Sequence, residues 1–209
     1  CQWFHKKRAK AVSIITKGQE HRHASSRYLS ALSRHHADFI KDQCHKISRS
    51  IINYCIEHHA GTLVLGENKR WKQDCDMGSQ NNQNFVSMPT GLLKQMIIYK
   101  ASDAGIKTIM QEESYTSQAD ITAMDYIPVY GVDAENAVFS GRRISRSLYR
   151  CFNGMIINAD CNGAANIMRK AITDAWNSIT DFSFLSSPEV SGFHELNPLS
   201  ISVKGIAAA

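Results

Sequence analysis

Two short apolar runs, each following a helical pattern and a glycine, restrict the folds open to this chain more than any other feature. Residues 62–65 read Thr-Leu-Val-Leu after Gly61, and residues 106–110 read Ile-Lys-Thr-Ile-Met after Gly105. Apolar runs of this length are typical of strands buried on both faces of a sheet. A helical pattern over residues 91–104 separates them. The order strand, helix, strand predicts a βαβ unit with two parallel strands, and therefore an α/β fold.

A parallel pair would bring the segments that follow the two strands to one edge of the sheet, where such sheets hold their ligands. Glu113 follows the second strand, and the segment 66–73 follows the first. That segment surrounds one tryptophan with three cations: Lys69, Arg70, Trp71 and Lys72. Cations beside an aromatic ring suit phosphate contact combined with base stacking. A tryptophan packed under the loop, with its cations in water, explains the same pattern equally well, so both interpretations stay open.

The stretch around Asp160, residues 156–168, reads Ile-Ile-Asn-Ala-Asp-Cys-Asn-Gly-Ala-Ala-Asn-Ile-Met. Asp160 occupies the predicted N-cap of a helix that we expect to continue to about Trp176, since a carboxylate there accepts backbone N–H groups. Ala164 and Ala165 would let this helix lie close against a neighbouring layer. A rigidly held acid of this kind suits a Mg²⁺-dependent nuclease. Spacing alone favours the simpler interpretation that Asp160 only caps the helix.

Basic residues are concentrated in two places. The net charge is +5, and residues 1–60, which carry helical patterns over 3–17 and 27–58, hold eleven Lys and Arg against four Asp and Glu. The second concentration is a cluster without any acid between Asn136 and Arg150: Arg142, Arg143, Arg146 and Arg150. Both favour a polyanion such as nucleic acid as partner, with the arginines contacting phosphate. Solvated basic surfaces without a specific role are the alternative.

Cysteine spacing and hydropathy exclude several classes of protein. No pair among the six cysteines has C-x-x-C spacing, which argues against a zinc site of the usual kind. No run approaches the ~20 apolar residues of a membrane span, and no signal peptide is evident. We therefore expect reduced thiols in a cytoplasmic protein without a membrane partner. The first residue is Cys1, which suggests a start inside a longer reading frame, and the oligomeric state is left open.

Seven motifs, none of them specific alone, occur in a fixed order along the chain. They are Ser-Ile-Ile-Thr-Lys-Gly (13–18), His-Lys-Ile-Ser (45–48), Gly-Glu-Asn-Lys-Arg-Trp-Lys-Gln (66–73), Asn-Asn-Gln-Asn-Phe (81–85), Glu-Glu-Ser-Tyr-Thr-Ser (112–117), Phe-Ser-Gly-Arg-Arg (139–143) and the run 158–167. In this order the chain resembles, nearly from end to end, the C-terminal half of TnpB-type proteins. These are transposon-encoded, RNA-guided DNA endonucleases, formerly called OrfB transposases and related to type V CRISPR effectors.

The resemblance implies a RuvC-like nuclease domain with an RNase H-type fold, in which three acids bind Mg²⁺ and cut DNA under the direction of a guide RNA. Asp160 matches the third of these acids. The second usually follows the strand matching residues 62–65, but that position is Gly66 here. Some relatives carry it two residues before the Tyr of Tyr-Thr-Ser, which is Glu113. The expected catalytic and metal-binding pair is therefore Glu113 and Asp160, with Glu67 as fallback and Glu112 as a further alternative.

Two departures from the family pattern limit what the resemblance implies. The family's first catalytic Asp lies upstream of the segment matching Trp3, so we expect this chain by itself to be inactive. Many relatives also carry two C-x-x-C pairs in the insertion after Tyr-Thr-Ser. The matching positions here are Asp120, Ala123, Cys151 and Gly154. One cysteine cannot hold zinc, so the insertion is expected to resemble a zinc-ribbon domain that has lost its metal.

The predicted organisation has five segments. They are a basic helical segment (1–60), a RuvC-like strand-helix-strand core (61–118), an insertion in the place of a target nucleic-acid-binding region (119–150), the final helix with Asp160 (151–180) and an irregular tail (181–209). Three functions stay open. The chain is the nuclease part of an RNA-guided endonuclease, a non-catalytic DNA- or RNA-binding remnant of a mobile element, or a generic basic α/β binding domain in which Glu113 and Asp160 do not cluster.

Overall fold

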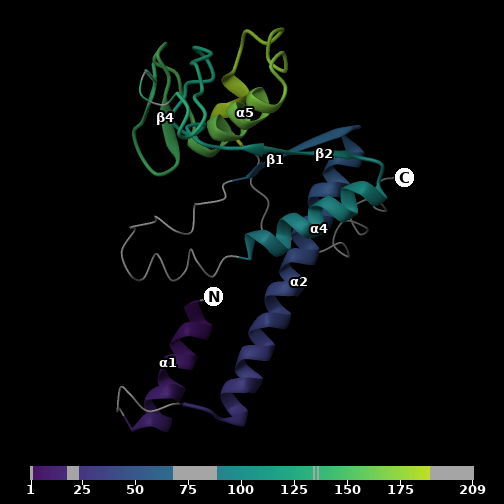
Figure 1. Ribbon diagram of the computed structural model, residues 1–209, viewed down its shortest axis with the longest axis vertical. Coiled ribbons are helices and arrows are strands. Elements are labelled where there is room, and N and C mark those ends of the chain that lie inside the picture. Colours follow the sequence, from purple (N-terminus) through teal and green to yellow (C-terminus); the bar gives the residue numbers. More distant parts are fainter. Residues whose placement is uncertain (1, 18–23, 68–88, 134, 136, 189–209) are drawn as a thin grey trace, which may run out of the picture. The chain divides into compact units, whose positions relative to one another are not determined.

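The protein is described here from a computed structural model, which covers residues 2–17, 24–67, 89–133, 135 and 137–188. Its contacts divide it into two compact units (Figure 1). One unit holds the described parts of 1–57 and 70–100, and the other those of 58–69 and 101–195. The helix α4 (Thr90–Asp103) runs from the first unit into the second. The mixed helix and strand content confirms the predicted α/β class.

The first unit is built from helices. α1 (Gln2–Thr16) packs against α2 (Arg27–Glu57), and the Phe4 ring stacks on the His36 ring with centroids 3.9 Å apart. α2 runs for 31 residues without a break, so the pattern over 27–58 belongs to one helix. A buried cation joins α4 to α2, because Lys100 Nζ donates to His45 O and to Ser48 Oγ, both at 2.7 Å.

The second unit contains the predicted parallel pair. β1 (Thr62–Glu67) lies beside β2 (Lys107–Glu112) in a register that pairs Thr62 with Lys107 and Glu67 with Glu112. Both strands run further than their apolar runs, because the ladder continues until Glu113 N donates to Glu67 O at 3.2 Å. No residue of either strand is fully buried, so the expected burial on both faces is wrong for this pair.

A second sheet follows in the same unit. The antiparallel strands β3 (Arg142–Arg143), β4 (Leu148–Arg150) and β5 (Ile156–Asn158) lie in that order, and β5 leads directly into α5 (Ala159–Ala171). α5 in turn contacts β1 and β2. The sheet therefore joins the predicted insertion to the final helix, with a hairpin that crosses the predicted boundary at residue 150. α5 ends five residues before Trp176, the predicted end of this helix.

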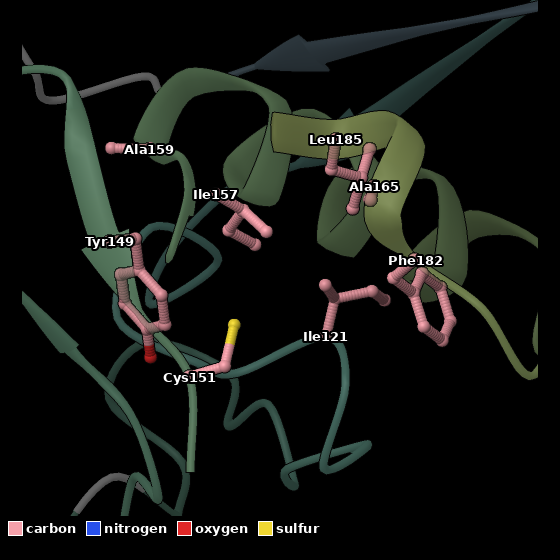
Figure 2. Close-up of a cluster of buried hydrophobic side chains, with 8 residues drawn as sticks. All are labelled: Ile121, Tyr149, Cys151, Ile157, Ala159, Ala165, Phe182 and Leu185. Carbon is pink, nitrogen blue, oxygen red and sulfur yellow. The ribbon is translucent and has the colours of Figure 1, made fainter. Parts of the chain in front are cut away.

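One apolar core holds the insertion, β5 and α5 together (Figure 2). Its buried members are Ile121, Tyr149, Cys151, Ile157, Ala159, Ala165, Phe182 and Leu185. Phe182 and Leu185 come from the segment that was predicted to be irregular, where Ser183–Ser186 form a short 3-10 helix, η2. Tyr149 also anchors its hydroxyl on Gln118 O at 2.7 Å. Within the described ranges, no helix has the length and apolarity to cross a membrane.

Candidate nuclease and nucleic-acid site

Asp160 lies in the first turn of α5 but does not cap it. The cap is Asn158, whose extended backbone (φ −69°, ψ 129°) lets its Oδ1 accept from Asp160 N at 2.9 Å and Cys161 N at 3.0 Å. The N-cap prediction for Asp160 is therefore wrong. An amide at the end of β5 already binds the free N–H groups, so the Asp160 carboxylate remains available, and 86% of its side chain is exposed.

Arg143 is the side chain that reaches this carboxylate. Its Nη2 lies 3.5 Å from Asp160 Oδ1. Its Nε donates to Ser145 O at 3.2 Å and to Arg146 O at 3.1 Å, and Nη2 also donates to Arg146 O. The backbone carbonyls of the β3–β4 turn therefore orient the guanidinium toward Asp160. The pairing of the strands brings the two residues together. β3, which carries Arg143, pairs with β4, and β4 pairs with β5, the strand that leads into Asp160.

The other predicted arginines extend the positive surface around this contact. Arg142 lies opposite Arg150 in the β3–β4 register, and Arg142, Arg146 and Arg150 are exposed. Among the described residues, the only ion pair made by the four arginines is the long one between Arg143 and Asp160. The four arginines thus form an exposed cationic surface. Each guanidinium group can bind two oxygens of one phosphate at the same time.

Glu113 reaches the same helix from the sheet side. Its carboxylate lies over Gly66 of β1, at a place that Ile167 of α5 also borders. Ile167 follows Asp160 by seven residues, about two helical turns or roughly 10 Å along the axis. Within the described residues Glu113 forms no side-chain hydrogen bond, and no contact joins it to Asp160. Asp160 thus lies in the first turn of α5 and the Glu113 carboxylate lies beside Ile167, further along the same helix, and their assignment as one metal pair stays a prediction.

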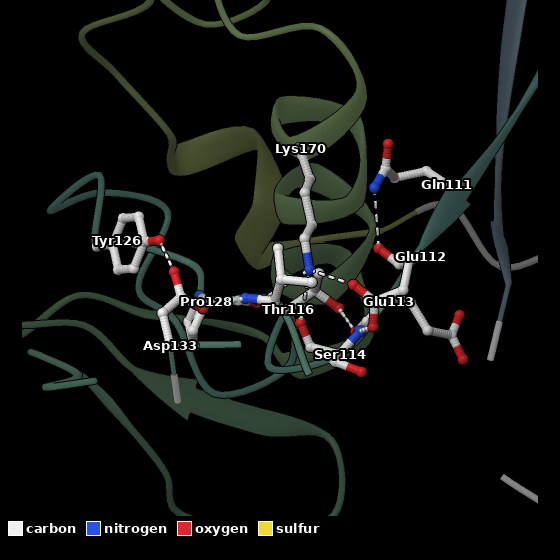
Figure 3. Close-up of polar contacts among 10 residues, drawn as sticks. Gln111, Glu112, Glu113, Ser114, Thr116, Tyr126, Pro128, Asp133 and Lys170 are labelled. Carbon is white, nitrogen blue, oxygen red and sulfur yellow. Dashed lines mark hydrogen bonds and ion pairs between the residues drawn. The ribbon is translucent and has the colours of Figure 1, made fainter. Parts of the chain in front are cut away.

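Glu112 is engaged elsewhere. Lys170 Nζ donates to Glu112 Oε2, to Pro128 O at 3.1 Å and to Ser114 O at 3.3 Å (Figure 3). Ser114 N donates to Glu112 Oε1 at 2.6 Å. Burial acts to raise the pKa of Glu112, but the hydrogen bonds from Lys170 and Ser114 outweigh it and hold this pKa below its ordinary value. These contacts fasten the turn after β2 to α5, while Glu113 points away from Lys170 (Figure 3).

Buried carboxylates occupy the part of the insertion where relatives were expected to hold zinc. Asp120 accepts from Thr122 N at 2.8 Å and from Phe152 N at 2.7 Å. Asp125 accepts from Asp120 N at 2.9 Å and from Ser140 N at 2.8 Å. The two side chains thereby connect segments 120–125, 140 and 152.

The matching Cys151 is buried, which raises its thiol pKa to about 11. In the described ranges, no three His, Cys, Asp or Glu side chains are grouped so as to hold a metal ion. The zinc expectation stays a prediction. For Mg²⁺ the donor chemistry of Glu113 and Asp160 is suitable, since this ion uses one or two carboxylates together with substrate phosphates.

The remaining predicted binding residues cannot be placed. Lys69, Arg70, Trp71 and Lys72 lie outside the described residues, whereas Glu67 ends β1 opposite Glu112.

Sequence reasoning missed Asn158, Lys170 and Asp125. Asn158 could have been found, because Asn is a strong N-cap residue and stands at the strand-to-helix junction. Lys170 binds Glu112 from 58 residues away and Asp125 accepts from Ser140, 15 residues away, so no local pattern identifies these contacts.

Comparison with known proteins gives the same assignment as the motifs. The Cas12f1-like TNB domain family matches residues 91–167, which run from α4 through the insertion into α5. The CRISPR-associated endodeoxyribonuclease Cas12f1 of Sulfoacidibacillus thermotolerans is 33% identical over 132 residues. This chain is homologous to the Cas12f proteins. The resemblance to TnpB-type nucleases is confirmed at this level, because the Cas12f proteins are TnpB-related, RNA-guided endonucleases.

The match to Cas12f proteins covers only part of them. The Cas12f1 alignment covers 63% of this chain and 27% of that protein. The CRISPR-associated endodeoxyribonuclease Cas12f2 of Micrarchaeota archaeon (strain CG1_02_47_40) is 30% identical over 141 residues. That alignment covers 63% of this chain and 24% of Cas12f2. The chain therefore spans about a quarter of the curated relatives that it matches.

Two solved structures show that the fold is shared. The Cas12f1 chain of a Cas12f1–sgRNA–target DNA complex superposes with a TM-score of 0.54 at 18% identity, covering 79% of this chain and 41% of that one. The C2c1 protein of Alicyclobacillus acidoterrestris, solved with a single-guide RNA, gives a TM-score of 0.51 at 18% identity, covering 81% and 19%. At these identities the superpositions establish the fold alone.

Proposed function

We propose that this chain supplies part of a RuvC-like, Mg²⁺-dependent centre that hydrolyses DNA in an RNA-guided endonuclease. The contact between Arg143 and Asp160 carries the proposal, because it places a phosphate-binding cation beside an exposed acid at the start of a fixed helix. The homology to Cas12f endodeoxyribonucleases supports it. DNA and a guide RNA are the proposed partners, as in the complex of the structural neighbour.

Arg143 would bind the phosphate that is to be cut. Its guanidinium is already oriented by Ser145 O and Arg146 O, so little conformational freedom is lost when it meets a phosphate oxygen. The positive charge also reduces the repulsion between the Asp160 carboxylate and an approaching phosphodiester. Arg142, Arg146 and Arg150 would hold the neighbouring phosphates and keep the strand in position along the β3–β4 hairpin.

Asp160 and Glu113 would hold the metal. Bound Mg²⁺ lowers the pKa of a water and stabilises charge on the leaving oxygen. Among the described residues, the long Arg143 contact is the only side-chain hydrogen bond that either carboxylate makes, so its oxygens can accept a metal ion. Glu112 is less suited, since Lys170 and Ser114 occupy its oxygens. Glu67 stays the alternative second acid.

The test uses residues 61–188, which include the Phe182 and Leu185 part of the apolar core, grafted into the Cas12f1 relative in place of its corresponding segment, together with the full chain. Each protein is assembled with guide RNA, target DNA and Mg²⁺, and cleavage and binding are measured separately. The graft should cut target DNA. Asp160→Ala and Glu113→Ala should each abolish cleavage while leaving target binding within a few-fold.

Two results would contradict the proposal. Undiminished cleavage by the Asp160→Ala graft would remove that residue from the chemistry. A graft that binds target DNA tightly but never cuts would favour the second candidate, a nucleic-acid-binding protein without catalysis. Loss of binding in Asp174→Ala, a substitution at an acid outside the proposed site, would show that the graft itself is damaged.

A further inference from the structure

The space that the Glu113 carboxylate occupies exists because residue 66 has no side chain. A Cβ built on Gly66 would lie closer than 3.0 Å to Glu113 Oε2, 3.4 Å from Glu113 Cδ and 2.9 Å from Ile167 Cδ1. Carboxylate and Cβ therefore compete for one volume. Gly61, just before the same strand, differs, since a Cβ there would meet nothing within 4 Å.

The backbone does not explain the glycine. Gly66 is paired with Gln111 inside the β1–β2 ladder and is not among the glycines with positive φ, so an alanine can adopt its conformation. What a side chain would displace is the far end of two flexible side chains, Glu113 and Ile167. Such ends can rotate away, so the fold can accommodate a substitution that the carboxylate position cannot.

We infer that Gly66 is a positioning residue that holds the Glu113 carboxylate against β1 and beside α5. This inference rests on the proposed function for its catalytic consequence, but the steric relationship stands without it. A Glu113 side chain that is displaced by Gly66→Ala would move its oxygens by an ångström or more. Misplacement of that size costs on the order of 100-fold in rate where metal geometry is strict.

The first measurement is independent of catalysis. In the full chain, the side-chain carboxyl ¹³C signal of Glu113 is identified by its loss in Glu113→Gln. Gly66→Ala should shift this signal and change its response to added Mg²⁺, whereas Gly61→Ala should leave both unchanged. An unshifted Glu113 signal in a folded Gly66→Ala protein would overturn the inference, whatever the protein does with DNA.

A double variant separates the two side chains that border Gly66. Ile167→Val removes Cδ1, so Gly66→Ala combined with Ile167→Val relieves the apolar contact and leaves the contact with Glu113. The Glu113 signal should stay displaced in the double variant. The melting temperature of the double variant should match that of Ile167→Val alone. Return of the signal to its wild-type position would assign the effect to Ile167 and overturn the inference.

The activity arm distinguishes the inference from the proposed function. In the graft, Gly66→Ala should lower cleavage about 100-fold and raise the Mg²⁺ concentration for half-maximal rate, with target binding unchanged. If Glu113 moves in the ¹³C measurement while Glu113→Gln cuts normally, the proposed catalytic role fails and the positioning relationship survives. If Glu113→Gln is inactive and Gly66→Ala cuts normally, the positioning role is overturned.

Discussion

Arg143 Nη2 lies 3.5 Å from Asp160 Oδ1, and the two residues belong to different elements joined by the β3–β4–β5 sheet. An exposed ion pair of this length contributes little to stability, since exposed pairs are worth ~0–1 kcal/mol. Its interest is chemical, because it places a cation that can bind phosphate beside a carboxylate that can bind metal.

Replacing Arg143 should therefore affect cleavage more than binding. Arg143→Gln is expected to lower the cleavage rate of the graft about 10–100-fold, the range typical of residues that orient metal-site ligands. Arg142 is the neighbour of Arg143 in β3. Arg142→Gln should weaken DNA binding about as much as Arg143→Gln does, but it should leave the cleavage rate at saturating DNA nearly unchanged. Equal rates for the two variants at saturation would show that the contact with Asp160 has no role in chemistry.

The arginine cluster predicts a salt dependence. Each substitution of Arg142, Arg143, Arg146 or Arg150 by Gln removes one phosphate contact, so the slope of log K against log salt should fall in magnitude by about 1 per residue. The control is Lys107→Gln, which removes an exposed lysine at the first position of β2, outside the arginine cluster. It should leave the slope unchanged. Equal slopes for wild type and all four arginine variants would place the DNA elsewhere.

The insertion should be held by Asp120 rather than by zinc. Asp120→Ala removes a buried carboxylate and leaves the partly buried N–H groups of Thr122 and Phe152 without their acceptor, which should destabilise the protein by roughly 3 kcal/mol. Asp133→Ala, at an exposed position of the same insertion, should cost clearly less. Chemical unfolding measures both, and a zinc chelator should leave the wild-type midpoint unchanged. A chelator-induced loss of stability would show a metal contribution.

The contact between Glu112 and Lys170 predicts a pH dependence of stability. The hydrogen bonds lower the folded-state pKa of Glu112 below its ordinary value of 4.5. A depressed carboxyl pKa stabilises the folded state above the unfolded pKa and ceases to do so as pH falls through the folded pKa. Glu112→Gln should therefore be less stable than wild type near pH 7, by less than about 1 kcal/mol at this half-exposed site.

That difference should vanish below the folded pKa, in the acid range under about pH 4. Unfolding free energies of wild type and Glu112→Gln, measured from pH 7 down to pH 3, test this. A gap that stays constant across the range would mean that the charge of Glu112 is not its source.

The α5 cap gives a purely structural prediction. Asn158→Ala should cost about 1 kcal/mol, because the N–H groups of Asp160 and Cys161 lose their acceptor. Asn158→Ser keeps an acceptor oxygen and should recover most of the loss. If Asp160 were itself the cap, Asp160→Ala would show this loss and Asn158→Ala would not, and thermal unfolding of the three variants separates the two cases.

Local patterns in the sequence were enough to determine the strand-helix-strand order, the parallel pairing of the apolar runs 62–65 and 106–110 and the helix that begins near Asp160. These features depend on periodicity, glycine placement and handedness rules that act over a few residues. The ordered motifs also indicated the nuclease relatives. The tertiary structure decided which side chains meet: Arg143 with Asp160, Lys170 with Glu112, and Glu113 over Gly66. Those contacts depend on sheet register and on close packing between segments far apart in the chain, and a sequence pattern carries no direct signal of either.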